Sequence, residues 1–412
     1  MARIPKYTDM GWPEQDALWT YNSLTEPLLS SELSRLSLAQ SYGNTDCVSL
    51  QPCPDPEAKN QDRYSILDWK LKDGIWRFRA VFDGHAGHDT VDYILNSLPP
   101  IIEVALTDLV EKVGDNTLDP HSVSTLLVEA IALLDNTMTQ DLLRLFPTPA
   151  VISALSDVEI DSIINDGKSG GVNSAIITRC MRGSTVLVSL LDPGEENLWV
   201  ASLGDCQSVL ARKRCNGDWE GLRLSSYHNG TEKTEKERIM KEHPGEMECV
   251  LDDRVLGAIA VTRAIGDHLF KLPAIYTNRI FMRKTPGFSI SRKIDEFLGR
   301  NLTPPYISNR ADIQHVALKS SEATDSFLVM FSDGLIDLYE EKDLDLDALA
   351  GYCAQVVGNA VGQGTRPCNL ASSLLRDALG GTDEEKISRM LTVEMSCRWM
   401  DDTTIIVHKI SD

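Results

Sequence analysis

Three apolar segments of the sequence end in the same way, with an aspartate beside a glycine: Asp83-Gly84, Gly204-Asp205 and Asp333-Gly334. Taken singly, such a pair after a strand is usually a turn. Here the preceding segments are apolar enough to be central strands, so we expect the three carboxylates to gather at one end of a sheet. Carboxylates brought that close repel one another unless a cation lies between them, and oxygen ligands with open water positions suit Mg²⁺ or Mn²⁺. The pattern therefore predicts a divalent metal site.

A histidine and further acids accompany these pairs. His85 follows Gly84 directly, and an imidazole exchanges a proton near neutral pH, so His85 is a candidate acid beside the metal. On the residues alone, a surface or helix-terminal role for His85 stays open. Asp62 precedes an early strand, and the pair Asp401-Asp402 opens the last one. The sequence offers no paired His and Cys ligands beside them, which argues against zinc.

The elements that must position these residues are a mixture of strands and helices. Residues 75–82 alternate and then turn fully apolar, as a strand entering a core does. Residues 197–203 follow another apolar strand after the short turn 192–195, and so short a connection implies antiparallel pairing. Helical periodicity runs through residues 121–145 and 369–379. The sequence predicts an α+β fold in which helices cover the outer faces of antiparallel sheets.

Composition argues against several classes of function. The 412 residues carry 40 Lys and Arg against 61 Asp and Glu, a formal net charge of −21, which disfavours binding to nucleic acid and to anionic membranes. Nine scattered cysteines without a C-x-x-C pair argue against a disulfide framework and favour a reducing compartment. The sequence has no run of 18 apolar residues to predict a membrane span, and its start predicts no secretion signal. We expect an intracellular protein, cytoplasmic in preference to mitochondrial unless a presequence has been removed.

Two regions differ from the rest of the chain. We interpret residues 1–40 as an N-terminal extension, and we expect it to pack through Trp12 and Trp19. Residues 271–310 hold several Arg and Lys among Pro and Gly, and predict an irregular basic insertion in an acidic protein. The ordinary interpretation of such a charge run is a solvated surface loop. A basic partner surface for a phosphorylated or acidic protein is the alternative.

Seven motifs in order resemble the type 2C metal-dependent protein phosphatases, which are serine/threonine phosphatases that require Mg²⁺ or Mn²⁺. The matching segments are residues 60–63, 81–87, 183–185, 202–206, 254–267, 331–337 and 401–404. The resemblance implies one catalytic domain over 41–412, built from two antiparallel β-sheets packed as a sandwich with α-helices outside. A dinuclear metal site would lie at one end of the sandwich. The segment 302–306 and the insertion before it most resemble the pyruvate-dehydrogenase-phosphatase-like branch.

The resemblance also implies roles for individual residues. The implied metal-site residues are Asp62 (through metal-bound water), Asp83 (bridging two ions), the Gly84 carbonyl, Asp333, Asp402, and Asp205 (with Asp333 at a weaker third site). A metal-activated water would attack phosphorus in line, and His85 would protonate the departing serine or threonine oxygen. This mechanism needs no covalent intermediate. The implied partner is a phosphorylated protein substrate. The implied oligomeric state of the enzyme is a monomer.

Departures from the family pattern leave alternatives open. Gln61 stands where Glu is usual, and Glu57 stands where many members have an arginine that binds substrate phosphate, so Lys59 or Arg63 is expected to substitute. Our first interpretation of Arg263 is a structural role, as the partner of an acid in an ion pair. Residues 227–250 correspond to a flap near the substrate cleft. A pseudophosphatase that only binds partners, and an enzyme for small phosphomonoesters, remain alternatives to a protein phosphatase.

Overall fold

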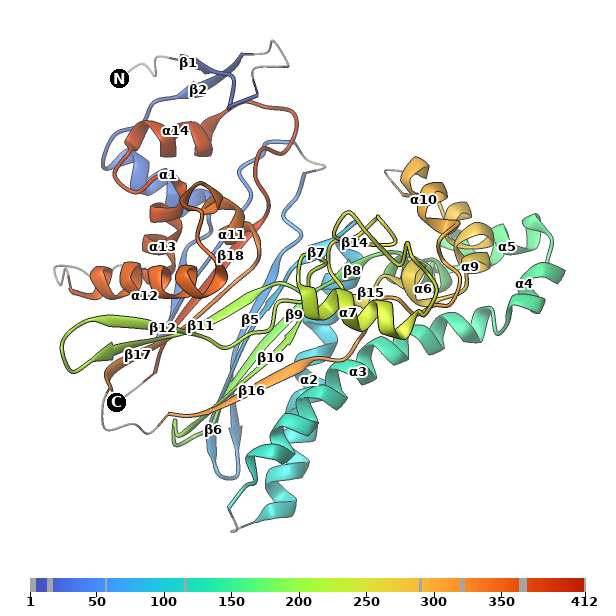
Figure 1. The fold of residues 1–412 in the computed structure, drawn as a ribbon, viewed down its shortest axis with the longest axis horizontal. Coiled ribbons are helices and arrows are strands. Elements are labelled where there is room, and N and C mark those ends of the chain that lie inside the picture. Colours follow the sequence, from blue (N-terminus) through green and yellow to red (C-terminus); the bar gives the residue numbers. More distant parts are fainter. Residues whose placement is uncertain are drawn as a thin grey trace.

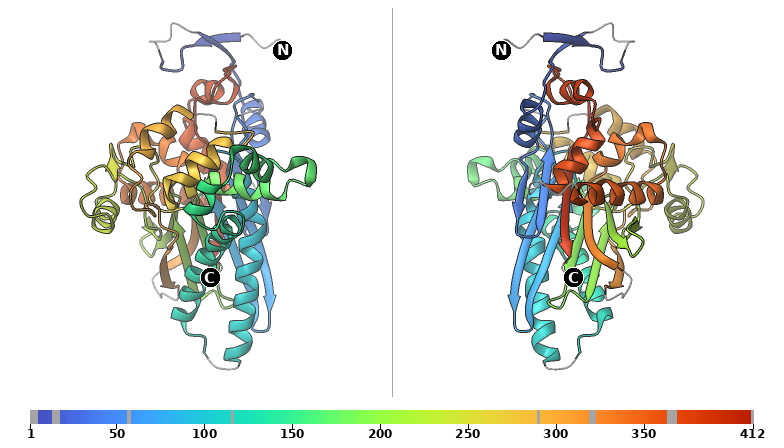
Figure 2. Two further views of the ribbon diagram at one scale, coloured as in Figure 1. Left: turned by 90° about the vertical axis from the view of Figure 1, so that its right-hand side faces the viewer. Right: turned by 90° about the vertical axis from the view of Figure 1, so that its left-hand side faces the viewer.

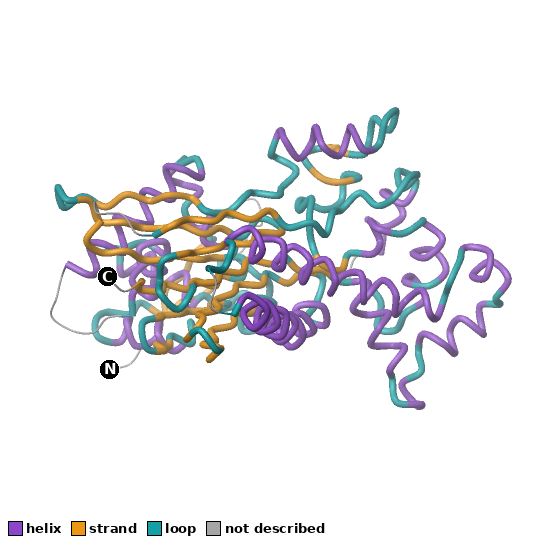
Figure 3. Tube along the Cα trace, turned by 90° about the horizontal axis from the view of Figure 1, so that it is seen from below, coloured by secondary structure: helices purple, strands orange, loops and turns teal. Residues whose placement is uncertain are grey.

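Two antiparallel sheets pack face to face and carry helices on their outer faces in this computed structural model (Figure 1), which confirms the predicted α+β sandwich. A helical lobe lies beyond one end of the strands (Figure 3). The structure describes residues 5–12, 18–55, 58–114, 117–288, 291–318, 323–362 and 369–410.

The first sheet has five strands in the order β16-β10-β9-β6-β5, and each neighbouring pair is antiparallel. Its strands are β5 (Arg63–Leu71), β6 (Gly74–Phe82), β9 (Val186–Leu191), β10 (Asn197–Leu203) and β16 (Asp312–Ala317). The strands predicted at 75–82 and 197–203 are therefore confirmed. β5 pairs with β6 and β9 with β10 across short turns, whereas β16 reaches the edge from much later in the chain.

The second sheet has six strands in the order β12-β11-β17-β18-β4-β3, again antiparallel throughout. Its strands are β3 (Gln40–Tyr42), β4 (Thr45–Leu50), β11 (Gln207–Arg214), β12 (Trp219–Arg223), β17 (Ala323–Phe331) and β18 (Thr403–Ile410). Thr45 in β4 lies opposite His408 in β18, 363 positions away, and the hydroxyl oxygen is 2.8 Å from the ring Nδ1. The middle of this sheet thus joins distant parts of the chain.

Strand β6 shows why the sequence folds into layers. Phe78, Ala80 and Phe82 are buried on the face that meets the outer helices, whereas Val81 is buried between the sheets with Met330 of β17. Alternate residues of a strand point to opposite faces, and β6 buries side chains on both, including the charged Arg79 on the face of Val81, so both faces are covered. β6 is therefore a central strand, and the residue that follows it lies at the end of the core.

Two long helices, α2 (Asp89–Val113) and α3 (Pro120–Leu145), cover the five-stranded sheet. α3 begins where the Asp119 carboxylate accepts a hydrogen bond from the His121 N–H and Pro120 occupies the first turn. By length and composition alone α2 is apolar enough to cross a membrane. Its side chains at Ile94, Leu98 and Ile102 are instead buried in the core against the sheet.

The six-stranded sheet is covered by helices from both ends of the chain. They are α1 (Leu28–Leu36), α11 (Gly334–Leu338), η4 (Glu340–Lys342), α12 (Leu346–Gly362), α13 (Leu370–Leu379) and α14 (Glu384–Thr392). The hairpin β1 (Pro5–Thr8) and β2 (Trp19–Asn22) lies above α14 (Figure 2). Trp12 packs edge-on against Trp19 at 6.1 Å between ring centroids, which confirms the predicted packing of the extension.

The helical lobe contains most of the segment predicted to be an irregular insertion. Its elements are α4 (Pro149–Ala154), α5 (Asp157–Ile164), η2 (Gly167–Ser169), α6 (Val172–Met181), α8 (His268–Lys271), α9 (Ala274–Arg279), η3 (Phe281–Arg283) and α10 (Ser291–Leu298). Short helices thus occupy parts of residues 271–310, and irregular segments connect them. Arg283 forms an ion pair with Asp161 at 2.7 Å, and Arg300 one with Glu248 at 2.8 Å. Local acids thus neutralise much of the basic charge.

A small sheet joins the lobe to the sandwich, in the order β15 (Ile265–Gly266), β8 (Gly183–Ser184), β7 (Gly84–His85). The segment 227–250, which was predicted to be a flap, contains α7 (Lys233–Glu242) and leads into the hairpin β13 (Val250–Leu251) and β14 (Arg254–Val255). Nothing in the structure tests whether this segment moves, so the flap stays a prediction.

A buried ion pair anchors β15 to α3. Both Asp135 oxygens accept hydrogen bonds from the Lys271 ammonium, at 2.8 and 2.9 Å, and Oδ1 also accepts one from the Gly266 N–H at 2.8 Å. The two side chains are only 2% and 8% exposed. Burial alone would raise the pKa of Asp135. The Lys271 charge and the hydrogen bonds that Asp135 accepts outweigh this effect, so the net pKa lies below its ordinary value.

We expect Asp135→Ala to lower the free energy of unfolding by roughly 3–5 kcal/mol, because it leaves the Lys271 charge buried without a partner. Urea denaturation of both proteins measures the difference. The pair stabilises the fold fully above the ordinary carboxyl pKa, and this contribution disappears as the pH falls through the depressed pKa of the folded state.

Asp141→Ala is the matched control, because Asp141 forms an exposed pair with Arg144 on the same helix. That substitution is expected to cost less than about 1 kcal/mol. Equal losses for the two variants would contradict the role given to Asp135.

Candidate active site

The three carboxylates predicted to gather do come together. Asp83 follows β6, Asp205 follows β10 and Asp333 follows β17. One carboxylate oxygen from each lies within 4.8 Å of the other two. Two of these strands belong to the five-stranded sheet and one to the six-stranded sheet. The cluster therefore forms where the ends of both sheets meet.

Two glycines let the backbone carry the carboxylates this close. Gly204 has φ +110°, and a Cβ there would lie 2.5 Å from the Cβ of Thr185. A Cβ at Gly84 would lie 2.7 Å from the carbonyl oxygen of Gln61. Thr185 holds the backbone of Asp83 with two hydrogen bonds. Its hydroxyl accepts from the Asp83 N–H at 3.2 Å, and its own N–H donates to the Asp83 carbonyl at 2.9 Å. A side chain at either glycine would push the cluster apart.

Two buried oxygens at the cluster have no hydrogen-bond partner among the described residues: Asp62 Oδ1 and Asp205 Oδ1. The other Asp62 oxygen accepts from the Ser332 hydroxyl at 2.6 Å, and the other Asp205 oxygen accepts from the Asn229 amide at 2.9 Å. Buried polar atoms are almost always paired, and an unpaired carboxylate oxygen is a ligand for a hard cation. The donor set therefore fits Mg²⁺ or Mn²⁺.

The protonation equilibria of these acids reflect the same crowding. Burial, followed by the charge of Asp333, raises the pKa of Asp83 well above its ordinary value. Burial and the Asp402 charge raise the pKa of Asp62 to about 7. Both effects are what closely spaced, desolvated carboxylates produce without a neutralising cation. A divalent ion bound between them would restore the ionised forms.

The structure places the predicted metal ligand Asp402 in a hydrogen-bond network beside the cluster. Its Oδ1 accepts a hydrogen bond from the Gln51 amide at 2.9 Å, and its Oδ2 accepts from the Gln61 N–H at 2.8 Å. The Asp402 side chain is 3% exposed, whereas Asp401 is 52% exposed and lines the cavity that holds the cluster. Neighbouring residues of an extended segment point in opposite directions. Asp401 is therefore the member of the pair that faces the cavity with the carboxylate cluster, and the ligand role of Asp402 stays a prediction.

His85 lies beside the cluster and is held by a second carboxylate. The small sheet β15-β8-β7 places Asp267, which follows β15, against His85 in β7, and His85 Nε2 lies 2.8 Å from Asp267 Oδ2. A Cβ at Gly183 would lie within 2.2 Å of both atoms, so only glycine admits the pair. Burial lowers the pKa of His85, but Asp267 raises it more, and the net pKa lies above its ordinary value. Sequence reasoning missed Asp267, although Gly266-Asp267 repeats the pattern of Gly204-Asp205.

The basic residues predicted to bind substrate lie elsewhere. Arg63 forms an ion pair with Asp92 at 2.8 Å and does not line the cavity, and Lys59 is exposed. Glu57 falls outside the described residues. Arg182 and Arg398 line the cavity instead. Sequence reasoning missed both arginines, because only the fold brings them to the metal cluster.

Arg398 and Gln61 are both held at the wall of the cavity. One Arg398 nitrogen lies 3.2 Å from Asp402, and another donates to the Lys59 carbonyl at 2.6 Å. Gln61, which stands where the family usually has Glu, accepts a hydrogen bond from the Gly87 N–H at 2.6 Å. The neutral amide thus still orders the loop that carries His85.

One cavity of about 860 Å³ contains the cluster, His85 and both arginines. Beyond the acids its wall includes the apolar side chains Val261, Phe270, Ile294 and Phe297 among charged ones such as Arg254, Glu296 and Arg300. The structure therefore combines a compact charged end with space for a larger ligand. Arg263 lies outside this cavity and pairs with Glu235 and Asp312 at 2.7 and 2.9 Å, as its predicted role as a structural ion-pair partner requires.

Comparisons with known proteins agree with this site. The sequence model of the family "Protein phosphatase 2C" matches residues 155–378, more than half of the chain. A protein phosphatase 2C homolog of Schizosaccharomyces pombe is 25% identical over 388 residues, which cover 89% of this chain and 79% of the relative. The mitochondrial pyruvate dehydrogenase (acetyl-transferring) phosphatase 1 of Homo sapiens is 28% identical over 61% of this chain. The matched region is 52% of that relative's length, so the chain spans about half of it.

Solved structures resemble the fold. The crystal structure of a serine-threonine phosphatase 2C from Toxoplasma gondii covers 90% of this chain with a TM-score of 0.52 and 15% identity, and 97% of that protein is matched. At that identity the likeness concerns the fold alone. Together with the family match and the carboxylate cluster, it leads to one conclusion. The chain belongs to the protein phosphatase 2C family, and its enzyme class is protein phosphatase.

Proposed function

We propose that this chain hydrolyses phosphoserine and phosphothreonine in proteins, with two Mg²⁺ or Mn²⁺ ions per active site. The observation that carries the proposal is the convergence of Asp83, Asp205 and Asp333 beside His85 within one cavity. A phosphate group needs local positive charge in a protein with a net charge of −21, and bound divalent cations supply it. The apolar side chains beyond the acids support a peptide substrate in preference to a small phosphomonoester.

The residues suited to hold the ions come from five segments of the chain. They are Asp83, the Gly84 carbonyl, Asp333 and Asp401, with Asp62 and Asp205 at the flanks. Divalent ions at this place lower the pKa of water toward neutrality and stabilise the negative charge that develops on phosphorus in the transition state. A third, weaker ion between Asp205 and Asp333 remains part of the proposal.

His85 is the proposed proton donor to the departing serine or threonine oxygen. Its Nε2 contacts Asp267, so the transferred proton is held at Nδ1. Asp267 fixes the orientation of the ring and favours the protonated form, because a nearby carboxylate stabilises an imidazolium. Arg182 and Arg398 are the proposed contacts of the phosphate oxygens, since both line the cavity and arginine binds phosphate in a bidentate manner.

We expect the purified protein to release phosphate from a phosphothreonine peptide when Mn²⁺ is present and not when EDTA is added. Asp83→Asn is expected to abolish the reaction, because it removes the central carboxylate of the cluster. Asp73→Asn is the matched control: Asp73 also precedes a glycine, but it only accepts from the Trp76 indole at 3.0 Å. Undiminished activity in EDTA would exclude the metal mechanism, and a chain that binds no Mn²⁺ in calorimetry would favour a pseudophosphatase.

His85→Ala should lower kcat for the phosphothreonine peptide by roughly 10²–10⁴-fold, the usual contribution of a general acid. The same variant should hydrolyse p-nitrophenyl phosphate at nearly the normal rate, because nitrophenolate leaves without a proton. Steady-state kinetics on both substrates measures the contrast. His88→Ala, at the next histidine of the loop, should leave both rates near normal. Equal losses on the two substrates would show that His85 does not act as the acid.

Arg398→Ala is expected to raise KM for the phosphopeptide roughly tenfold, since a hydrogen bond to a charged group contributes about 1.5–3 kcal/mol. Arg63→Ala serves as the comparison, because Arg63 is bound to Asp92 and to the backbone carbonyls of Asn60 and Asp62, and it does not line the cavity. It should leave KM unchanged. The opposite ranking of the two variants would return the phosphate-binding role to Arg63.

A further inference from the structure

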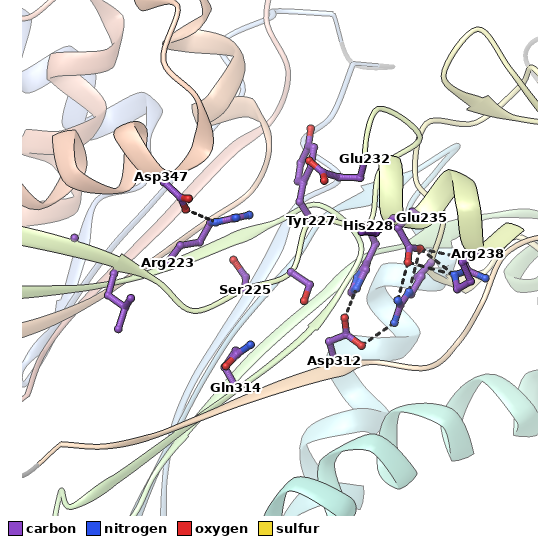
Figure 4. A pocket seen from close by; sticks show the side chains of 15 residues that line it. Arg223, Ser225, Tyr227, His228, Glu232, Glu235, Arg238, Asp312, Gln314 and Asp347 are labelled. Carbon is purple, nitrogen blue, oxygen red and sulfur yellow. Dashed lines mark hydrogen bonds and ion pairs between the residues drawn. The ribbon is translucent and has the colours of Figure 1, made fainter.

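A chain of polar side chains runs from helix α7 to His228 (Figure 4). From His228 it continues to Gly204, the residue before Asp205. The chain runs beside a second cavity, of about 700 Å³, which lies between α7 and the edge strands β12 and β16. Its members are Glu235, Arg263, Asp312 and His228. None of these side chains contributes an oxygen to the carboxylate cluster, so the roles proposed above leave them unused.

The last link of this chain holds Gly204 from both sides. The Gly204 N–H donates to His228 Nδ1 at 3.2 Å, and the His228 N–H donates to the Gly204 carbonyl at 2.9 Å. A backbone N–H can only donate, so Nδ1 is unprotonated and the ring proton of neutral His228 is on Nε2. That Nε2–H donates to Asp312 Oδ2 at 3.0 Å. Asp312 therefore fixes both the tautomer and the ring plane that Gly204 requires.

The other oxygen of Asp312 is held by Arg263, whose Nη1 donates to it at 2.9 Å. Arg263 donates in turn to Glu235 of α7 at 2.7 Å, and Glu235 is only 4% exposed. The hydrogen bond from His228, supported by the Arg263 charge, lowers the pKa of Asp312, which keeps it ionised. α7 is thus tied to His228 by charge-assisted hydrogen bonds, which are roughly twice as strong as neutral ones.

The same loop also holds the Asp205 carboxylate. Asn229, the neighbour of His228, donates to Asp205 Oδ2 at 2.9 Å, which leaves Oδ1 as the buried oxygen without a partner among the described residues. One loop thus fixes the backbone before Asp205 through His228 and the carboxylate orientation through Asn229. Movement of the His228 ring would displace both, because the two residues are adjacent.

We propose that Asp312 is a positioning residue for the metal site, which acts through His228 and Gly204 to aim the free Asp205 oxygen at the carboxylate cluster. The inference rests on the proposed function, since it assigns Asp205 to the binding of a divalent ion. Partners that orient a metal ligand commonly affect metal affinity by 10–100-fold when they are removed. A residue that only stabilises the fold would change the melting temperature and leave the affinity for the ion intact.

The test compares Asp312→Ala with Asp347→Ala in the full chain. Asp347 lines the same cavity from the far side and is paired with Arg223 at 2.9 Å (Figure 4). Among the described residues, the hydrogen bonds of Gly204 go to His228 and not to this pair. Calorimetric titration with Mn²⁺ alone, without substrate, measures metal affinity, and thermal melts without metal measure stability. We expect Mn²⁺ affinity to fall about tenfold in Asp312→Ala and to stay at the wild-type value in Asp347→Ala. Asp312→Asn, which keeps one acceptor oxygen for His228, should lose less.

The outcomes separate this proposal from the proposed function. Wild-type affinity for Mn²⁺ in Asp312→Ala overturns the positioning role alone, and so does an equal loss in Asp347→Ala. A wild-type chain that binds no Mn²⁺ overturns both proposals. If Asp312→Ala does not fold, unchanged affinity in Asp312→Asn and in Glu235→Gln overturns the role, and a loss in both supports it.

Discussion

The repulsion among carboxylates at the junction of the two sheets is the constraint on which the rest of the structure depends. Asp83, Asp205 and Asp333 each follow a strand, and each would move away from the others if its backbone were free. The sheets prevent this because the strands before them are buried on both faces and cannot shift without opening the core. Gly204 and Gly84 permit the close approach, and Thr185 holds Asp83 in place.

Two ion-pair systems stabilise the walls around this acidic centre. Asp135 and Lys271 tie β15 to α3 and so determine where Asp267 meets His85. Glu235 and Arg263 tie α7 to the loop beside Asp205. Both systems are largely buried, and both fix backbone that carries a functional side chain. Charged residues far apart in the sequence thus help to place both His85, the proposed proton donor, and Asp205.

The sequence was sufficient for features that depend on local pattern. Alternation and the Asp-Gly pairs predicted the strands and the convergence of Asp83, Asp205 and Asp333, because a buried strand leaves little choice of position for the residue that follows it. Which of Asp401 and Asp402 faces the cavity depends on the direction of each side chain. The sequence pattern cannot separate them, because two adjacent aspartates look the same in it. Arg398, which lines the cavity, was not predicted, and Arg63, which was predicted, does not line it, because proximity to Asp62 in the sequence says nothing about the walls of a cavity. The helices within 271–310 were hidden by Pro and Gly.

The pairing of β4 with β18 has a consequence for synthesis on the ribosome. The two strands lie side by side in the six-stranded sheet, yet Thr45 and His408 are 363 positions apart. A growing chain emerges from its N-terminal end, so β4 must wait, unpaired on one side, until nearly all of the residues described here have been made. The segment 401–402 that completes the acidic centre arrives with the same late strand. β4 therefore keeps an unpaired edge until β18 has been made, and the acids of segment 401–402 can join the other carboxylates only then.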